Sequence, residues 1–475
     1  MIADPYTGEP QPNLVEKWEM PDSTHIVFHI AKGAKFHNIA PWNGRDFDAE
    51  DLAFNFDRTV GNTAAAENLP KGSFLHSDWF TAMSKVEVVD KYTAKVTLKN
   101  PSSAFIINMV DHRNMMMPKG VVEVGFKDPM KLAGLAGYQL TEFVPGVREV
   151  YSKVPGYRRA GQPHMDKIIN TVVADRGAQV AGFISKQFSI LTSATDQDIK
   201  TVTAARPDTL LYKGIGISWH HIRPSFKIPA FADFRVRKAM QLAIDYQEIG
   251  NGYYGPGWGY LMGLHSYYPE SWNEDKVKTL PGYNPATKAQ DTAEAQKLME
   301  AAGFPQGAGM KFKQINSSAA SLDSSVRLQE NWKKAFPRME VAVSSISDYA
   351  QATNALNTRT FDIRSWNHTS VPDAAIDAVT YYHTKGGRNY QSYSKPWADE
   401  LLDKLLLAVT LEERRSLVQT FEKRYLTEGP PLIPIRHPAD NLALQPHIAG
   451  TDMVIGPWAY NSYGVSPRWM WFTEK

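Results

Sequence analysis

The sequence predicts an α/β protein that folds as more than one compact unit. The chain has 475 residues, which is too long for one ordinary hydrophobic core and long enough for two or three units. Segments with the two-residue alternation of strands are mixed with segments of helical periodicity along the whole length. Apolar residues make up 43% and charged residues 21%, which is the balance of a globular protein and not of a disordered one.

The first part of the chain predicts a small sheet with a helix beside it. Residues 24–30 alternate apolar and polar, which is typical of a half-buried strand. Asp48 has the position of a helix N-cap, because two acidic residues follow it in what would be the first turn of a helix over residues 49–60. Residues 86–98 predict a hairpin that turns at Asp90.

The later part of the chain is dominated by helical patterns. Residues 234–249 predict one amphipathic helix with an apolar and a charged side. A second helix is expected over 292–302, where Gly303 supplies the stop signal. Two further helices are expected between residues 397 and 426, with a break near Thr410.

Charge and cysteine content exclude several classes of function. The chain carries 52 basic and 50 acidic residues, a net charge of +2, and we expect no nucleic-acid partner because such a partner requires a concentrated basic surface. There is no cysteine, which excludes thiol catalysis, zinc–thiolate sites and iron–sulfur clusters. No apolar stretch approaches the roughly 20 residues that span a bilayer, and residues 1–5 do not resemble a secretory signal.

Several segments, in a fixed order, resemble those of one known family. They are PNLVEKWE at 12–19, FHIAKGAKFH at 28–37, DAEDL at 48–52, YQL at 138–140, FRVRKA and AID at 234–239 and 243–245, YNP and AQKLMEAAGF at 283–285 and 295–304, and PLIPI at 431–435. Together they resemble the family 5 extracellular solute-binding proteins, which are the dipeptide-, oligopeptide- and nickel-binding components of ABC importers. Most of these residues are structural, so the resemblance speaks to the fold more than to the ligand.

The resemblance implies a two-lobed periplasmic-binding-protein-like fold of class II, cluster C type. Lobe I is expected over residues 1–215 and 438–475, and lobe II over 216–437. Two crossing hinge strands would join the lobes, the first in 216–221 and the second in 433–441. A ligand would be enclosed between the lobes when the hinge closes.

The sequence departs from the family pattern in two places. The family has several dozen residues, including a first strand, before the segment at 12–19, so we expect this chain to be truncated at its N-terminus and to have lost its leader there. The insertion Asn38–Arg45 replaces a short turn of the family, and we expect it to be a surface elaboration.

The function implied by the resemblance is capture of a small molecule for an ABC importer, with no chemistry done on it and no cofactor. A peptide or an amino-acid derivative is favoured as the solute. The implied partner is a membrane permease, the protein is expected to be a monomer, and its location is expected to be periplasmic or extracytoplasmic. A carbohydrate or a metal-chelate complex is the alternative within the same fold.

Two other classes of function stay open at this stage. A receptor that binds a signal molecule and docks on a sensor would use the same binding physics. A glycoside hydrolase or another hydrolase would need a pair of carboxylates, which folding can assemble from distant positions. However, the sequence contains no G-x-S-x-G, H-E-x-x-H or phosphate-loop pattern.

The first group of candidate ligand contacts lies in the expected first crossing. Trp219, His220 and His221 stand about where this family places ligand-contacting residues. Because neighbouring strand residues face opposite ways, His220 and His221 cannot both face a ligand. The alternative is that these side chains pack the hinge.

The second group lies at residues 365–373. Peptide-binding relatives carry a W-x-A-D segment here, whose aspartate pairs with the α-ammonium of the peptide, because a buried ammonium needs a carboxylate partner. In this sequence Trp366 matches the tryptophan, Thr369 stands at the aspartate position, and Asp373 is the nearest acid. Trp366 is the leading single candidate, against the alternative of packing in the core of the lobe.

Further candidates are aromatic residues and histidines. Trp258, Tyr381 and Tyr382 could stack on a sugar or an aromatic solute, or be ordinary loop aromatics. His368 and His383, with His220 or His221, could hold a metal-chelate complex, although no local ligand spacing supports a metal site.

Overall fold

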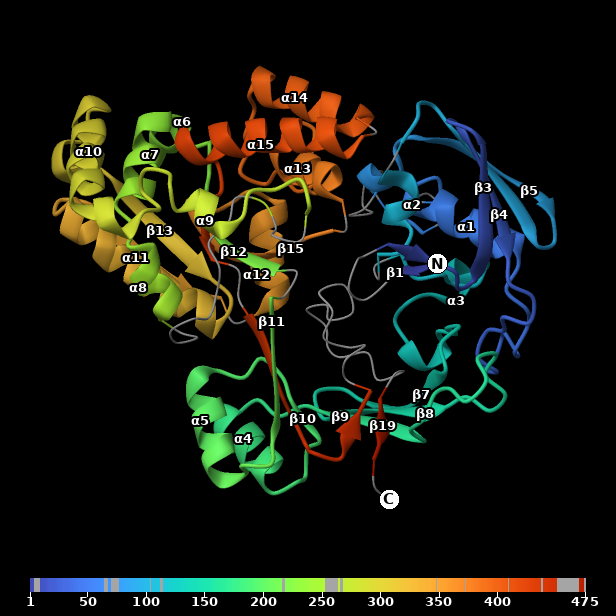
Figure 1. Ribbon diagram of the computed structural model, residues 1–475. Helices are drawn as coiled ribbons and strands as arrows, with labels where there is room; N and C mark the ends of the chain where they lie inside the picture. Colours follow the sequence, from blue (N-terminus) through green and yellow to red (C-terminus); the bar gives the residue numbers. More distant parts are fainter. Residues whose placement is uncertain are drawn as a thin grey trace. The chain divides into compact units, whose positions relative to one another are not determined.

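The structure, a computed structural model, divides the chain into two compact units. Unit 1 consists of Met1–Gly214 and Asn441–Lys475, and unit 2 of Ile215–Asp440 (Figure 1). The residues described are 1–3, 9–63, 67–69, 77–102, 104–111, 114–215, 218–252, 264, 268–346, 348–371, 373–408, 410–436, 439–450 and 470–473. Trp258, one of the candidate contact residues, lies outside these ranges.

Unit 1 contains three main sheets with short helices between them. The sheet orders are β3-β4-β6-β5, β7-β8-β9 and β10-β17-β11. Its elements are β1 Ile2–Ala3, β2 Pro10–Gln11, β3 Val15–Asp22, β4 His25–Ile30, α1 Ala49–Thr59, η1 Ser77–Phe80, β5 Met83–Asp90, β6 Thr93–Leu98, α2 Ala104–Asn108, α3 Val121–Val124, η2 Pro129–Lys131, β7 Tyr138–Val144, β8 Arg148–Lys153, β9 Lys167–Thr171, α4 Arg176–Ile184, β10 Ile190–Leu191, α5 Asp196–Ala205, β11 Leu210–Ile215, β17 Ala439–Leu444, β18 Ile448–Ala449 and β19 Trp471–Phe472.

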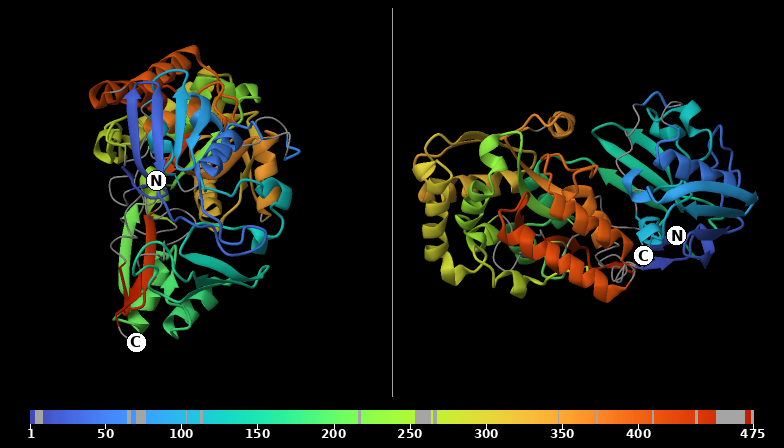
Figure 2. Two further views of the ribbon diagram at one scale, coloured as in Figure 1. Left: turned by 90° about the vertical axis from the view of Figure 1, so that its right-hand side faces the viewer. Right: turned by 90° about the horizontal axis from the view of Figure 1, so that it is seen from above.

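The four-stranded sheet of unit 1 is antiparallel and buries one face under α1 (Figure 2). Ile26 and Phe28 of β4 are completely buried, as the predicted alternation requires. Phe28 meets Phe56 of α1, with ring centroids 6.1 Å apart, and Phe56 stacks on Phe105 of α2 at 5.8 Å. The predicted strand, hairpin and helix of this region are therefore confirmed.

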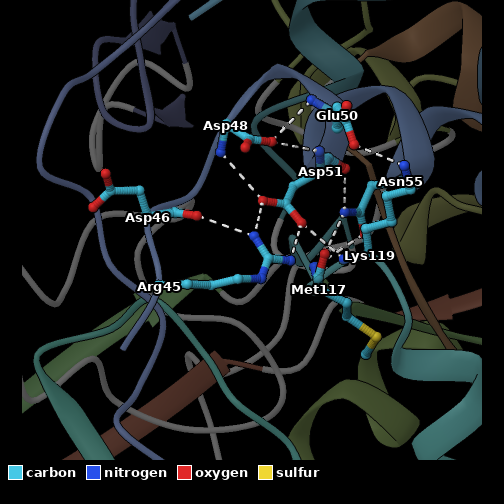
Figure 3. Close-up of polar contacts among 8 residues, drawn as sticks. All are labelled: Arg45, Asp46, Asp48, Glu50, Asp51, Asn55, Met117 and Lys119. Atoms are coloured by element: carbon cyan, nitrogen blue, oxygen red, sulfur yellow. Dashed lines mark hydrogen bonds and ion pairs between the residues drawn. The ribbon is translucent and has the colours of Figure 1, made fainter. Parts of the chain in front are cut away.

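The N-terminus of α1 is fixed by a network around one buried carboxylate, that of Asp51 (Figure 3). Asp48 is the predicted N-cap, and its side chain accepts hydrogen bonds from the backbone N–H groups of Glu50 and Asp51. Asp51 in turn accepts from the backbone N–H of Asp48 at 3.2 Å, which completes a capping box. It also accepts from Arg45 at 2.6 Å and 2.8 Å and from the backbone N–H of Lys119 at 2.8 Å.

The insertion Asn38–Arg45 is more than a surface elaboration. Half of its residues are exposed, but the indole of Trp42 is buried and donates a hydrogen bond of 3.1 Å to the carbonyl oxygen of Lys131. At its end, Arg45 pairs with the buried Asp51. The insertion is therefore anchored at both of these points to the body of unit 1.

Unit 2 is built on one mixed five-stranded sheet of order β14-β13-β15-β12-β16. β13 is parallel to β14 and β15, whereas β12 is antiparallel to β15 and β16. Its elements are β12 Ser218–Pro224, α6 Pro229–Ala232, α7 Phe234–Leu242, α8 Tyr246–Asn251, α9 Glu274–Val277, η3 Pro285–Thr287, α10 Lys288–Ala301, η4 Pro305–Gly307, β13 Lys311–Asn316, α11 Ala319–Ala335, β14 Glu340–Ser345, α12 Tyr349–Asn357, β15 Ile363–Thr369, α13 Ala374–Tyr382, α14 Pro396–Leu407, α15 Leu411–Thr427 and β16 Ile433–Arg436.

The prediction of a single helix over residues 234–249 is wrong, because the structure has two helices in this segment. α7 ends at Leu242, and α8 begins at Tyr246. The carboxylate of Asp245 caps α8 by accepting a hydrogen bond of 2.9 Å from the backbone N–H of Glu248. A short polar side chain competes for backbone donors in this way, and the chain therefore starts a new helix where the periodicity alone continued the old one.

The other predicted helices of unit 2 are confirmed. α10 ends where Gly303 adopts a positive φ of 92°, which is the left-handed stop expected of it. α14 and α15 lie side by side (Figure 1) and are separated by a break at which the hydroxyl of Thr410 caps α15. Within the helical layer, Tyr382 of α13 packs against Phe421 and Tyr425 of α15.

Candidate ligand-binding site in unit 2

The candidate site lies on one face of the antiparallel pair β12 and β15, which are neighbours within unit 2 (Figure 1). In a strand every second residue faces the same side, and residues directly opposite across an antiparallel pair share that side. The register places three such cross-strand pairs in a row. We call this set the β12–β15 face; it consists of Trp219 opposite His368, His221 opposite Trp366, and Arg223 opposite Arg364.

Aromatic contacts order one end of the β12–β15 face. The ring of Trp219 lies 4.7 Å from that of His221 and 5.0 Å from that of His368, measured between centroids. Tyr381 of α13 stacks on His368 at 3.5 Å with an angle of 29° between the rings. Asp377, also on α13, lies 2.8 Å from Nε2 of His368, and both side chains are almost fully buried. Helix α13 therefore fixes the position of the His368 ring through a carboxylate and a stacked phenol.

His221 is held as a neutral ring next to a positive charge. Its Nε2 lies 3.1 Å from a guanidinium nitrogen of Arg223. Burial, and secondly the charge of Arg223, keep the pKa of His221 well below its usual range. Because the guanidinium can only donate, Nε2 of His221 accepts this hydrogen bond and Nδ1 carries the proton.

The other end of the β12–β15 face is basic. The guanidinium of Arg364 lies over the indole of Trp366, 4.7 Å from the ring centroid. The guanidinium of Arg223 lies 5.1 Å from the ring of Tyr390 and 5.8 Å from that of Tyr381. Contacts of this kind stabilise a cation by about 2 kcal/mol when the pair is removed from water. The face therefore combines flat apolar surfaces with buried positive charge.

His220 lies on the opposite face of β12, as alternation predicted. Its Nε2 is 2.6 Å from the hydroxyl oxygen of Ser365, and both residues are almost completely buried. The prediction that His220 and His221 face opposite ways is confirmed. His220 does not belong to the β12–β15 face.

The candidate residues of the segment 365–373 differ in their positions on β15 and in their exposure to a ligand. Trp366 is half-buried and packs at the edge of a cluster that includes Ile315 and Leu356. Thr369 is the last residue of β15 and lies opposite Ser218 in the register. Of the candidates in this segment, Trp366 and His368 share the β12–β15 face.

Asp373 is fully engaged within unit 2. One of its carboxylate oxygens accepts a hydrogen bond of 2.9 Å from the backbone N–H of Ile376 and so caps α13. The other lies 2.6 Å from the guanidinium of Arg414, which also pairs with Glu270 at 2.8 Å. The carboxylate of Asp373 therefore stabilises the start of α13 and the buried Arg414.

The two tyrosines of α13 have different surroundings. Tyr381 stacks on His368 and receives a hydrogen bond of 2.9 Å from the guanidinium of Arg388, so it packs against the β12–β15 face. Tyr382 lies against Tyr425 in the helical layer, with ring centroids 4.9 Å apart, and belongs to the core. His383 faces Asp399 and Asp403 of α14, at 3.7 Å and 3.5 Å.

Sequence reasoning missed three residues of this site: Arg223, Arg364 and Asp377. The two arginines continue the alternation that places Trp219 and His221, and Trp366 and His368, on one side of their strands. This alternation assigns the two arginines to the β12–β15 face only when the bounds and the register of the strands are known. Asp377 carried no signal, because a helix brings it to a histidine of a strand nine residues earlier.

The part of the chain that the structure describes contains no candidate metal site and no candidate membrane-spanning helix. Among these residues, no group of three or more His, Asp or Glu side chains could hold a metal ion. In the part of the chain that the structure describes, no helix combines the length and the apolar character needed to cross a bilayer.

The chain matches a family of solute-binding proteins, which are binding proteins and not enzymes. Residues 9–390 match the sequence profile described as Bacterial extracellular solute-binding proteins, family 5 Middle, and the chain belongs to this family. Members of the family bind small solutes and work with the permeases of ABC importers. The family resemblance and the two-lobed α/β fold expected from the sequence are thereby confirmed.

Individual relatives agree with this assignment. Heme-binding protein A of Haemophilus influenzae is 24% identical over 96% of this chain and 84% of its own length. The periplasmic oligopeptide-binding protein OppA of Escherichia coli is 22% identical over 95% of this chain and 83% of its own length. The crystal structure of Haemophilus influenzae OppA in complex with the peptide RPPGFSPFR has a TM-score of 0.82, with 18% identity over 100% of this chain and 92% of that one.

Proposed function

We propose that this protein captures a short peptide or an amino-acid derivative in the periplasm, as a monomer, and delivers it to the permease of an ABC importer. The observation that carries the proposal is the β12–β15 face, on which the half-buried Trp366 lies next to buried positive charge in a protein of the solute-binding family. Apolar surface with a few convergent polar groups is the usual composition of a small-molecule site. The relatives named for oligopeptide binding support the choice of solute.

The position of Thr369 sets this chain apart from standard peptide binders. A peptide ammonium that becomes buried requires an anionic partner. Thr369 has no charge, and the carboxylate of Asp373 already serves the N-terminus of α13 and Arg414. A solute recognised mainly through its own negative charge and its flat or apolar parts fits these residues better than one recognised through its ammonium group.

A metal chelate with a flat organic ring is the second candidate. It is favoured by the relative named as a heme-binding protein and by the aromatic side chains of the β12–β15 face. The half-buried Trp366 would offer a stacking surface to such a ring. The same residue would serve an aromatic peptide side chain, so the two candidates are separated by experiment.

A binding experiment tests the proposed function. Short peptides and haemin would be screened by thermal shift, and hits would be measured by isothermal titration calorimetry. Replacement of Trp366 by Ala is expected to weaken binding by about 2 kcal/mol or more, roughly thirtyfold, if the indole is an anchor of the ligand. Hydrolysis of any tested compound would contradict the proposal.

The chain offers a matched control for this variant. Trp397 of α14 is also half-buried in unit 2 and also lies under a guanidinium, that of Arg424 at 4.0 Å from the ring centroid. Trp397→Ala should therefore lose a similar cation–π contact while it keeps the affinity of the wild type. Equal binding by the Trp366→Ala variant and the wild type would remove Trp366 from the site.

A further inference from the structure

A buried histidine, His37, stands where two parts of unit 1 meet. Only 7% of its surface is exposed. In the chain it follows β4 of the four-stranded sheet and directly precedes the insertion Asn38–Arg45. Its ring lies against the segment 133–137, which leads directly into β7 of the three-stranded sheet. His37 therefore connects the chain that leaves one sheet to the chain that enters another.

Three hydrogen bonds make this connection. The backbone N–H of His37 donates to the carbonyl oxygen of Gly134 at 2.9 Å, and the backbone N–H of Gly134 lies 3.2 Å from Nδ1 of the ring. On the other side of the ring, Nε2 lies 3.1 Å from the carbonyl oxygen of Ala136. A methyl group on Gly134 would lie 3.2 Å from Cε1 of the ring, so the missing side chain permits this close approach.

The partners of the ring fix its protonation state. A backbone N–H can only donate, so Nδ1 of His37 accepts the hydrogen bond from Gly134 and carries no proton. A carbonyl oxygen can only accept, so Nε2 carries the proton and donates it to Ala136. The ring is therefore neutral. A second proton, on Nδ1, would point at the N–H of Gly134, break that hydrogen bond and leave a charge in a buried place.

The surroundings of His37 do not compensate such a charge. Within the described part of the chain, burial is the main cause that lowers the pKa of His37, the hydrogen bond to Ala136 opposes it, and no charged side chain contributes. The segment 133–137 itself carries no titratable side chain. The charged neighbours of His37 along the chain, Lys35 and Arg45, are paired with carboxylates of their own.

A second contact between the same parts of unit 1 does not titrate. The indole of Trp42, in the insertion, donates to the carbonyl oxygen of Lys131, just before the segment 133–137. Neither group changes its charge between pH 5 and pH 8. Acid therefore acts on the contacts of His37 and leaves the contact of Trp42 in place, so we expect a local opening and not the unfolding of unit 1.

We propose that His37 is an acid-sensitive latch of unit 1, whose neutral ring holds the segment 133–137 and whose protonation releases it. We call the contacts of His37 with Gly134 and Ala136 the His37 latch. Below the usual histidine pKa of 6.5, the open state binds more protons than the closed state. The closed latch therefore has its full stability above about pH 6.5 and loses it as the pH falls. This inference concerns unit 1 alone and does not depend on the solute.

Hydrogen–deuterium exchange followed by mass spectrometry tests the latch on the intact protein. Protection factors would be measured from pH 8 to pH 5 for peptides that cover the segment 133–137 and, as an internal reference, for peptides of α1. Because opening takes up one proton, the protection of the segment 133–137 should fall by up to about tenfold for each pH unit below 6.5. The protection of α1 should not follow this dependence.

Variants connect the pH dependence to the ring. The amide of His37→Gln offers an acceptor and a donor but has no titratable proton, so the protection of the segment 133–137 should no longer depend on pH. His25→Gln is the control. The ring of His25 lies 2.8 Å from the carboxylate of Asp22 at an exposed turn, and its loss should leave the pH dependence of the segment unchanged.

Two results would overturn the role of His37. One is a constant protection of the segment 133–137 in the wild type over the whole pH range. The other is a pH dependence of this segment that survives in His37→Gln. If His37→Gln does not fold, the wild-type comparison between the segment 133–137 and α1 decides. Since no ligand is added, none of these results bears on solute binding.

Discussion

At the scale of single residues, the clearest case is Asp51 in unit 1. Its two carboxylate oxygens receive four hydrogen bonds, two from Arg45 and two from the backbone N–H groups of Asp48 and Lys119. These donors come from the insertion, from the start of α1 and from a distant loop. One buried carboxylate thus joins three segments, which explains why an acid stands at this position of the DAEDL segment.

Replacement of Asp51 by Ala is expected to lower the free energy of unfolding by about 2–3 kcal/mol. The change leaves two backbone donors and the partly buried Arg45 without their acceptor. Urea unfolding followed by circular dichroism would measure it. Glu50→Gln is the control, because the ion pair of Glu50 with Lys119 is exposed and its loss should leave the midpoint of urea unfolding unchanged.

The contact residues of the candidate site were partly predictable for a physical reason. Trp366 and His221 lie in strands, where alternation separates two faces without knowledge of the fold, so the contrast between His220 and His221 could be derived from the sequence. The engagement of Asp373 could not be derived, because its partner Arg414 lies 41 residues further along the chain. Such pairs are created by packing and leave no periodic signal.

At the scale of elements, the sequence predicted helices better than their ends. The periodicity of residues 234–249 correctly predicted helical structure on both sides of Asp245. It did not predict the break between α7 and α8, because the hydrogen bond that caps α8 depends on the orientation of the Asp245 side chain. Where the break coincided with a strong signal, as at Thr410 before α15, it was predicted.

Helix α15 carries a buried acid that should make stability depend on pH. Both carboxylate oxygens of Glu422 accept hydrogen bonds of 2.8 Å, from the backbone N–H groups of Leu264 and Trp272. Burial nevertheless raises the pKa of Glu422 from 4.5 to about 7. The folded state then binds more protons than the unfolded state between these values.

The contribution of Glu422 is therefore complete below about pH 4.5 and is lost as the pH rises through about 7. One pKa unit corresponds to about 1.4 kcal/mol, so the shift from 4.5 to about 7 limits the loss to about 3–4 kcal/mol. Chemical unfolding at several pH values would measure the slope. Glu422→Gln should flatten it between pH 4.5 and 7, while Glu412→Gln, on the exposed side of α15, should retain it. A wild-type slope in the Glu422→Gln protein would assign the pH dependence to another group.

At the scale of the whole molecule, the chain passes between its two compact units twice. Unit 2 is one continuous segment, Ile215–Asp440, whereas unit 1 is assembled from both ends of the chain. We propose that these units are the two lobes and that a bound solute draws them together. This arrangement was expected from the family resemblance. Hydrophobic periodicity could not have predicted it, because periodicity does not indicate which distant segments of the chain share a unit.

Closure predicts a measurable compaction. Small-angle X-ray scattering at saturating ligand should give a smaller radius of gyration than the ligand-free protein, and light scattering should give the mass of a monomer, 53.2 kDa, in both states. The Trp366→Ala variant at the same ligand concentration serves as the control and should compact less. An unchanged radius of gyration in wild-type protein that calorimetry shows to be saturated would rule out closure.

The discontinuity of unit 1 has a consequence for the order in which the protein is made. β17 lies between β10 and β11 in their sheet, and Ala443 of β17 completes a core cluster with Phe183 and Leu191. A ribosome that adds about 5–20 residues per second needs about 10–50 s to synthesise Ile215–Asp440 before it reaches this strand. During that interval unit 2 is still being synthesised, and β10 and β11 of unit 1 lack the strand that pairs with both of them. Newly made chains are therefore most exposed to aggregation in the half that was synthesised first.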